Sequence, residues 1–300
     1  MSDGPLVIAL GGNALKGQPG SLALTGLKKA CATLSGYAGS GLVITHGSGP
    51  QIGLLSLSHS GDRKVTLDVL DAEVEGWLGY LIEQELDNCL DEQSSPVTLL
   101  TRIEVDSADP AFKNPSKPVG PWMPAADAKK LADRLGWNFL EGNCDFKRIV
   151  PSPLPRRILQ ASVVSELVKR GHAVICAGGG GIPVIRDRLG RFQGVEAVID
   201  KDLASALLAI QLDARLLVMA TDVPGIYKDW DATDRELINR ISADRLAELE
   251  LAPGSMGPKA TAARNYVNAT GNIAVVGALN DLSSLIELKA GTRVFPSRSL

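Results

Sequence analysis

The sequence predicts an α/β fold with a mostly parallel central sheet, and two observations lead to this prediction. Short apolar runs recur along the chain, hydrophobic at nearly every position rather than at every second one, which is typical of strands buried on both faces. Longer helical patterns lie between these runs, as in alternating βα units. Because 45% of the 300 residues are hydrophobic, the chain can bury a large core, and we expect one domain over residues 1–300.

Six apolar runs are the predicted strands, and in chain order they are Leu6–Leu10, Leu42–Thr45, Val97–Thr101, Ala173–Ala177, Leu216–Ala220 and Ile273–Gly277. The clearest helix pattern extends from Leu67 to Leu90, where apolar residues recur every three or four positions. Its apolar stripe is wide enough to contact both the core and a second copy of the chain. We therefore expect a homodimer.

A proline-rich stretch over residues 103–153 interrupts the alternation of strands and helices. It contains a short helix pattern over Ala125–Leu135 and weak strand patterns at Phe139–Leu140 and Arg148–Val150. It also carries apolar residues of its own, such as Trp122 and Trp137, which a linker would not need. We interpret this stretch as a small subdomain inserted into the larger fold.

Composition excludes several classes of protein. The net charge of −3 argues against a broad nucleic-acid surface, although a local basic pocket remains compatible with it. No apolar run approaches the roughly 18 residues of a membrane span. The four cysteines are scattered, with no CxxC pair, which indicates neither a zinc site nor a disulfide framework. With no signal-peptide pattern at the start of the chain, we expect a cytoplasmic protein.

Glycine-rich loops follow three of the predicted strands. Ligands bind beyond the carboxyl ends of strands in open α/β sheets, and glycine there lets backbone N–H groups approach an anion. A single such loop is explained by turn chemistry, but three in one sheet predict a pocket for a polyanion. The motifs of P-loop enzymes, dinucleotide-binding folds and zinc proteases are absent. The three loops contain Gly11, Gly12 and Asn13, then Gly47, Ser48 and Gly49, and finally Gly178 and Gly179.

Three lysines complete the predicted pocket. Lys201 and Lys259 each lie near the start of a helical pattern, where the positive end of the helix dipole disfavours a cation. A bound anion would remove that conflict. Lys117 lies between prolines of the inserted subdomain, which restrict the directions of its backbone. We expect the insertion to close over the site, so that Lys117 meets the substrate only in the closed form.

Several strings of this sequence, taken together and in order, resemble the carbamate kinases of the amino-acid kinase family. GGN, GGGGIP and TDV are general to that family, whereas KNPSKPVGP and the PSP that closes the insertion resemble the carbamate kinases specifically. The strings are ALGGNAL (Ala9–Leu15), THGSGPQIGLL (Thr45–Leu55), DPAFKNPSKPVGP (Asp109–Pro121), VPSPLPRRI (Val150–Ile158), CAGGGGIPV (Cys176–Val184), AVIDKDLA (Ala197–Ala204), ATDVPGIY (Ala220–Tyr227) and GSMGPK (Gly254–Lys259).

The resemblance implies a three-layer sandwich with a protruding lid, and reversible phosphoryl transfer between ATP and carbamate with Mg²⁺ accompanying the nucleotide. By motif position, Lys201 and Lys259 resemble the lysines that stabilise the transferring phosphoryl group. Asp202 resembles the carboxylate that orients them, and Lys117 resembles the lid lysine that reaches the substrate. No metal ligand is expected from the protein itself, and no covalent intermediate is expected.

The resemblance also assigns two groups of binding residues. The substrate and phosphate group comprises Gly11, Gly12, Asn13, Gly47, Ser48, Gly49, Gly178 and Gly179. The nucleotide group comprises Asp222, Val223, Tyr227 and Met256, of which Tyr227 and Met256 would contact adenine. The expected small-molecule partners are therefore ATP or ADP and carbamate or carbamoyl phosphate.

Two positions depart from the resembled pattern, because Ser48 and Leu54 stand where many carbamate kinases have Asn. Two other functions therefore remain as alternatives. The first is a related kinase with a different small acyl, acylated amino-acid or nucleoside monophosphate substrate, against which the insertion argues. The second is a non-catalytic nucleotide-binding regulator, against which the four polar side chains at Lys117, Lys201, Asp202 and Lys259 argue.

Overall fold

A central sheet of eight strands organises the computed structural model, which describes residues 4–11, 24–59, 65–91, 95–228, 235–251 and 256–297. All six predicted strands lie in this sheet, with ends that differ by at most two residues from those expected. The strand order is β15-β17-β16-β12-β1-β2-β9-β3, and every neighbouring pair is parallel except β16 and β17. The strands are β1 (Leu6–Leu10), β2 (Leu42–His46), β3 (Val97–Leu99), β9 (Val174–Cys176), β12 (Leu216–Thr221), β15 (Arg240–Ser242), β16 (Ile273–Ala278) and β17 (Thr292–Phe295).

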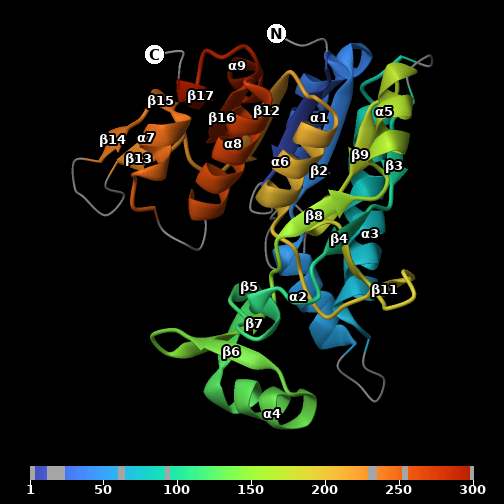
Figure 1. Ribbon diagram of the computed structural model, residues 1–300, viewed down its shortest axis with the longest axis vertical. Helices are drawn as coiled ribbons and strands as arrows, with labels where there is room; N and C mark the ends of the chain where they lie inside the picture. Colours follow the sequence, from blue (N-terminus) through green and yellow to red (C-terminus); the bar gives the residue numbers. More distant parts are fainter. Residues whose placement is uncertain are drawn as a thin grey trace.

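Helices cover both faces of this sheet, as continuous apolar strands require (Figure 1). In β1, Leu6, Ile8 and Leu10 belong to one hydrophobic cluster, whereas Val7 and Ala9 belong to the other. The first cluster includes residues of α1 (Leu24–Ser35), α3 (Leu67–Asp87) and α9 (Leu282–Ile286). The second includes residues of α5 (Ala161–Lys169), α6 (Lys201–Gln211), α7 (Ala243–Ala247) and α8 (Met256–Thr270). The predicted α/β fold with a mostly parallel sheet is confirmed.

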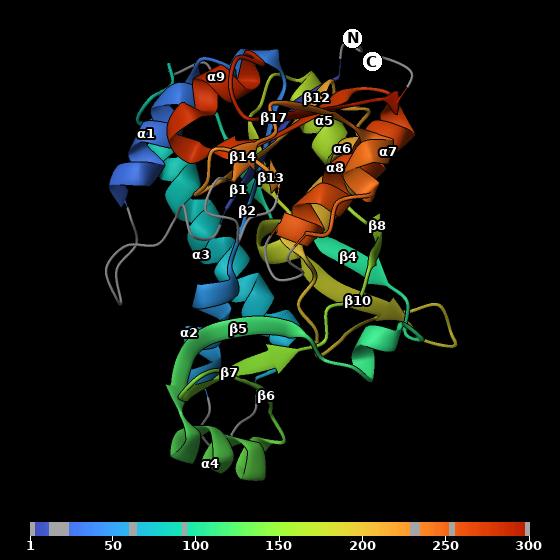
Figure 2. The same cartoon turned by 90° about the vertical axis from the view of Figure 1, so that its left-hand side faces the viewer.

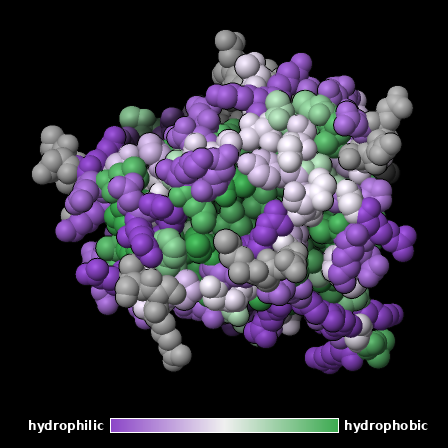
Figure 3. Space-filling model, turned by 90° about the horizontal axis from the view of Figure 1, so that it is seen from above, coloured by the Kyte–Doolittle hydropathy of each residue, from purple (hydrophilic) through white to green (hydrophobic). Residues whose placement is uncertain are grey.

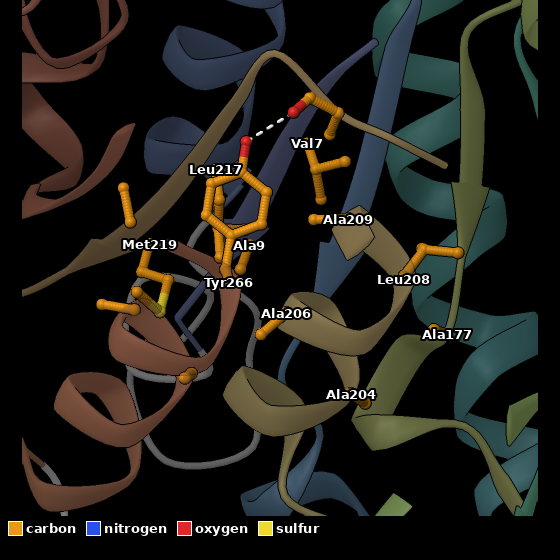
Figure 4. Packing of buried hydrophobic residues seen from close by; sticks show 14 of the residues in the cluster. Val7, Ala9, Ala177, Ala204, Ala206, Leu208, Ala209, Leu217, Met219 and Tyr266 are labelled. Atoms are coloured by element: carbon orange, nitrogen blue, oxygen red, sulfur yellow. Dashed lines mark hydrogen bonds between the residues drawn. The ribbon is translucent and has the colours of Figure 1, made fainter. Parts of the chain in front are cut away.

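Small side chains let α6 lie close to the sheet. Ala206 and Ala209 of α6 pack near Val7 and Ala9 of β1, while Tyr266 of α8 is fully buried beside them (Figure 4). The Tyr266 hydroxyl donates a hydrogen bond to the carbonyl of Ala214, which follows α6. This packing fixes α6 and α8 together, and it places both helix N-termini near the carboxyl ends of the central strands.

A second, four-stranded sheet lies beside the central one and leads into the insertion. Its order is β11 (Phe192–Gly194), β10 (Ile182–Arg186), β4 (Arg102–Val105) and β8 (Pro155–Ile158). Two smaller elements complete this description: the hairpin of β13 (Tyr227–Lys228) with β14 (Glu236–Leu237), and α2 (Gly49–Ser58).

The proline-rich insertion contains an antiparallel sheet of β5 (Lys117–Pro124), β7 (Asp145–Val150) and β6 (Asn138–Glu141), covered by α4 (Ala125–Leu135). The helix has the bounds that the sequence indicates. The strand β5 is unexpected, because it contains Pro118, Pro121 and Pro124. It is an edge strand with a register shift between Pro118 and Trp122, and prolines are tolerated at edges because no ladder N–H is needed there.

The base of this subdomain is fixed to the main body by close contacts (Figure 2). A Cβ placed on Gly53 of α2 would lie 1.8 Å from the Cα of Gly120 in β5, so glycine is required for these backbones to approach. Nearby, the Arg148 guanidinium lies 3.7 Å from the centre of the Trp137 ring and 3.4 Å from a carboxylate oxygen of Glu196. These contacts therefore hold the stem of the subdomain in place, while α4 lies further from the central sheet.

The outer surface is mainly polar on the face seen from above. Hydrophilic side chains cover most of it, and hydrophobic ones gather in patches between them (Figure 3). No helix among the described residues is both long and apolar enough to span a membrane.

Candidate active site

A cavity of about 210 Å³ lies at the carboxyl ends of the central strands, beside the stem of the insertion. The loops after β1, β2 and β9 contribute to it, as the glycine pattern predicts. Nine of the sequence-predicted site residues line it: Gly11, Gly47, Ser48, Gly49, Lys117, Gly179, Lys201, Asp202 and Lys259. The lining also includes Pro50, Pro118, Val198, Asp200, Thr221 and Pro258, which the sequence did not indicate.

Three helices begin at this cavity. Residues of the first turn of α2, α6 and α8 line it, represented by Gly49, Lys201 and Lys259 respectively. Helix N-termini carry unpaired N–H groups and a partial positive charge, so each favours an anion. Lysines near two of them add to this positive charge, and the carboxylate of Asp202 contacts both. The cavity is therefore suited to several negative charges at once.

Asp202 lies between the two lysines and contacts both. Its Oδ1 accepts a hydrogen bond from Lys201 Nζ at 2.7 Å, and its Oδ2 accepts one from Lys259 Nζ at 3.0 Å. The Asp202 side chain is 5% exposed. Burial alone would raise the pKa of Asp202, but the two ammonium groups lower it to about 2. Burial lowers the pKa of Lys201, and the charge of Asp202 opposes this shift.

Lys117 is held at the cavity by a residue that sequence analysis missed. Its Nζ donates to Asp200 Oδ2 at 2.8 Å, while Asp200 Oδ1 caps α6 by accepting from the N–H groups of Asp202 and Leu203. Lys117 lines the cavity in this structure as the first residue of β5, at the stem of the insertion. The expectation that the insertion closes over the site stays a prediction.

Three of the predicted glycines use their N–H groups within the protein. The N–H of Gly11 donates to the carbonyl of Ala220, and that of Gly47 donates to the carbonyl of Leu10, so both extend the sheet. The N–H of Gly178 donates to Glu75 Oε1, and Gly178 does not itself line the cavity. Gly12 and Asn13 lie outside the described residues.

The predicted nucleotide residues lie apart from this cavity, at the ends of neighbouring elements. Asp222 follows Thr221, which lines the cavity, and accepts a hydrogen bond from its hydroxyl at 3.0 Å. Tyr227 lies in β13, where the Arg235 guanidinium is 5.4 Å from the centre of its ring. Met256 begins α8 and packs against the hydrophobic core. Val223 is half-buried between these elements and does not line the cavity.

Comparisons with known proteins agree with this arrangement. Residues 4–276 match the model of the amino acid kinase family. A carbamate kinase of Haemophilus influenzae is 46% identical over 297 residues, covering 96% of each chain. A carbamate kinase of Rhizobium meliloti is 44% identical and covers 98% of this chain and 94% of its own. The chain belongs to the carbamate kinases of the amino acid kinase family.

A solved carbamate kinase shares the fold as well as the sequence pattern. The Giardia lamblia carbamate kinase bound to AMP-PNP is 32% identical, with a TM-score of 0.86, and the match covers 98% of this chain and 99% of that one. The family resemblance read from the motifs is therefore confirmed over nearly the whole chain, including the insertion.

The site of this carbamate kinase family member contains residues that sequence analysis missed. Asp200 stands directly before Lys201, at the N-cap position of a predicted helix, so its capping role could have been inferred. Asp71 and Glu75 lie on α3, 1% exposed each, beneath the loop of Gly178 and Gly179. The α3 pattern could have indicated them: Asp71 lies four residues after Leu67 and Glu75 lies seven residues before Ile82, so both carboxyl groups fall on the apolar face of the helix.

Proposed function

We propose that this protein catalyses reversible phosphoryl transfer between ATP and carbamate, forming ATP from ADP and carbamoyl phosphate in the catabolic direction. One observation carries the proposal: Lys117, Lys201 and Lys259 come from three separate elements and meet in one cavity at three helix N-termini. The family supports the same reaction, since the relatives with high identity over their full lengths are carbamate kinases.

Positioning and charge stabilisation account for the chemistry. Both reacting groups are anions, so bringing them together needs fixed positive charge. We assign Lys201 and Lys259 to the transferring phosphoryl group, because Asp202 holds both ammonium groups within 3.0 Å of its own oxygens. Lys117 reaches the carbamoyl end from the insertion. The acyl oxygen attacks or leaves directly, and no side chain forms a covalent bond to phosphorus.

Mg²⁺ is proposed to arrive with the nucleotide. Among the described residues no three His, Cys, Asp or Glu side chains lie close enough together to hold a metal ion. A cation that is bound mainly by nucleotide phosphates, as is common for Mg²⁺, needs no such cluster of protein ligands. When bound, the ion would neutralise phosphate charge at the transferring group. We propose that Asp222, Val223, Tyr227 and Met256 bind the rest of the nucleotide, since Asp222 and Val223 follow Thr221 of the lining, Tyr227 lies in the hairpin after them, and Met256 begins α8, which also lines the cavity.

A coupled assay for ATP formation tests the reaction. The purified protein is expected to form ATP from ADP and carbamoyl phosphate in the presence of Mg²⁺, and to use acetyl phosphate far less well. Preference for another acyl phosphate would instead support a different small substrate. Nucleotide binding without turnover would support a regulatory function.

We further propose that the protein is a homodimer that assembles through α3 and the sheet edge at β3. Val69, Trp77 and Tyr80 of α3 are exposed by 41–59%, as is Leu100 beyond β3 by 49%. Large apolar side chains gathered on one helix and an edge strand are typical of an interface. Light scattering at micromolar concentration should give twice the 31.6 kDa chain mass, and a monomer mass would exclude this assembly.

The free state of all four cysteines supports a reducing, cytosolic location. Cys31 and Cys176 are buried and Cys89 and Cys144 are exposed, none of them in a disulfide. Fractionation of the cells that produce the protein would test this.

A further inference from the structure

A buried carboxylate supports the glycine turn at one end of the cavity, which Ser48 and Gly179 line and which we call the substrate end because the family resemblance assigns both residues to the substrate. Glu75, in the third turn of α3, accepts two backbone hydrogen bonds: from Gly178 N to Oε1 at 2.9 Å and from Thr101 N to Oε2 at 2.9 Å. The Thr101 hydroxyl in turn accepts from the N–H of Ala177 at 3.0 Å. One side chain of α3 therefore connects to two successive residues of the turn, either directly or through Thr101.

This turn needs such support because its backbone is unusual. Ala177, Gly179 and Gly180 have φ values of +49°, +70° and +105°. A non-glycine residue with positive φ is strained, and consecutive left-handed residues do not form a self-supporting helix. The turn also approaches the opposite wall closely: a Cβ on Gly179 would lie 2.4 Å from Ser48 Oγ. Because Gly179 and Ser48 both line the cavity, the position of this turn sets its shape.

We propose that Glu75 is a positioning residue, which in its ionised form fixes the Gly178–Gly179 turn and thereby the substrate end of the cavity. The inference rests on the proposed function and adds a residue that does not touch the substrate. Two N–H groups face the two carboxylate oxygens, which is the arrangement an ionised carboxylate satisfies. Protonation places a hydrogen on one of those oxygens and weakens its contact with the turn.

The surroundings of Glu75 make this protonation accessible near neutral pH. Burial raises the pKa of Glu75 to about 8, against the lowering effect of the N–H groups of Thr101 and Gly178 and of the Thr101 hydroxyl. Three titratable groups face it. His46, over Gly178, has a pKa lowered to about 4 by burial, and burial also raises the pKa of the Cys176 thiol, so both stay neutral. The pKa of Asp71 is raised by burial and by the charge of Glu75.

The pH dependence of the rate tests the proposal, because a contact that only stabilises the fold would not change the rate when its carboxyl group gains or loses a proton. For the wild-type protein, kcat/KM for carbamoyl phosphate is expected to rise with pH through about 8. The lowered pKa of Lys201 produces the opposite trend, a loss of rate on deprotonation, so the two arms are distinguishable. Glu75→Gln is expected to lower kcat/KM for carbamoyl phosphate by about tenfold or more and to remove the rising arm, since small displacements of binding groups are costly to rate. ADP affinity should stay unchanged.

A matched control lies two turns further along the same helix. Glu83 Oε2 accepts from the N–H of Thr98 at 2.7 Å, so it also connects α3 to backbone near β3, but away from the cavity. Glu83→Gln is expected to keep both the rate and the rising arm. Asp71→Asn, which removes the other buried carboxyl group, should also keep the arm.

Three results would overturn the proposal: a wild-type profile without a rising arm, an arm that survives in Glu75→Gln, or an arm that disappears only in Asp71→Asn. The first needs no variant and therefore decides the matter even if Glu75→Gln does not fold. A wild-type protein that makes no ATP would instead contradict the proposed function itself. ATP formation by the wild type, with Glu75→Gln and Glu83→Gln behaving alike, would contradict only the role of Glu75.

Discussion

Two clusters of buried ionisable side chains flank the cavity. In one of them lysines contact the carboxylate, and in the other no cationic side chain of the described ranges does. On the α6 and α8 side, Asp202 is in direct contact with Lys201 and Lys259. On the α3 side, Asp71 and Glu75 are equally buried, yet no Lys or Arg lies within ion-pair distance of either carboxyl group among the described residues. Both oxygens of Asp71 also have no hydrogen-bond partner in the described part of the chain.

The comparison shows that the pKa of a buried carboxyl group depends on whether cations contact it. Burial raises the pKa of Asp202, Asp71 and Glu75 alike, but the two ammonium groups reverse the effect only for Asp202. The lysine cluster keeps one net positive charge, which an anionic phosphoryl group can use. The α3 cluster offers no positive charge to an anion. Its contribution is to fix the backbone of the Gly178–Gly179 turn through Glu75.

The largest expected effect comes from removing a charge on the lysine side. Lys201→Met should lower kcat by about 10³-fold or more, since a charge that stabilises the transition state is lost, whereas folding stability should change little. Asp202 keeps its contact with Lys259 at 3.0 Å, so no buried charge is left unpaired. Steady-state kinetics and thermal melting measure both quantities. Lys169→Met, an exposed change on α5, is the control, and retained turnover in Lys201→Met would remove that lysine from the chemistry.

The next effect concerns the lysine that the insertion contributes. Lys117→Ala should lower kcat/KM for carbamoyl phosphate by about 10²-fold, because its ammonium lines the cavity, while calorimetric ADP affinity should change little. Lys113→Ala, an exposed lysine four residues earlier, should behave like wild type. Equal turnover of the two variants would place Lys117 outside the site.

The sequence could predict the lysine side far better than the α3 side. Lys201, Asp202 and Lys259 lie in the first turns of helices, and the conflict of the two lysines with the helix dipole is readable from local sequence. The six apolar strands were likewise readable, because strands buried on both faces are apolar throughout. Local patterns of this kind determine the central sheet and most of the cavity lining.

The remainder depends on contacts between distant segments. Glu75 lies 103 positions before Gly178, and Lys117 lies 83 positions before Asp200, so no local sequence pattern predicts either contact. The strand β5 was missed for a different reason: its prolines oppose a strand assignment unless the strand is known to lie at an edge. Edge position is a property of the assembled sheet.

The two clusters should also give opposite pH dependences of stability. The pKa of Asp202 is lowered in the folded state to about 2, so its contribution to the free energy of unfolding is present above about pH 4 and is lost as the pH falls towards 2. The pKa of Glu75 is raised to about 8, so stability is lost as the pH rises from about 4.5 to 8. Each unit of pKa shift corresponds to at most about 1.4 kcal/mol.

Denaturant unfolding at several pH values measures these slopes. Glu75→Gln should flatten the loss between about pH 4.5 and 8 and leave the acid side unchanged, whereas Asp202→Asn should do the reverse. An unchanged slope in Glu75→Gln would show that Glu75 does not titrate in this range. The comparison between the two clusters would then rest on geometry alone.

The smallest effect is expected at Asp200, the residue that joins the insertion to the lysine side. Asp200→Asn keeps the cap of α6, since Asn caps helices about as well as Asp, but it removes the negative charge that holds Lys117 at 2.8 Å. Two consequences oppose each other. Lys117 becomes less well positioned, which lowers kcat, while the cavity loses a charge that repels the anionic substrate, which lowers KM.

We expect positioning to dominate turnover and charge to dominate binding. Asp200→Asn should therefore lower kcat by roughly three- to tenfold, equivalent to about 0.7–1.4 kcal/mol, with an unchanged or lower KM for carbamoyl phosphate. Asp109→Asn is the control, because Asp109 also caps a short helix and, among the described residues, accepts hydrogen bonds from the backbone N–H groups of Ala111 and Leu154. A raised KM with unchanged kcat would mean that Asp200 binds the substrate itself, through the amino group of carbamate, rather than acting through Lys117.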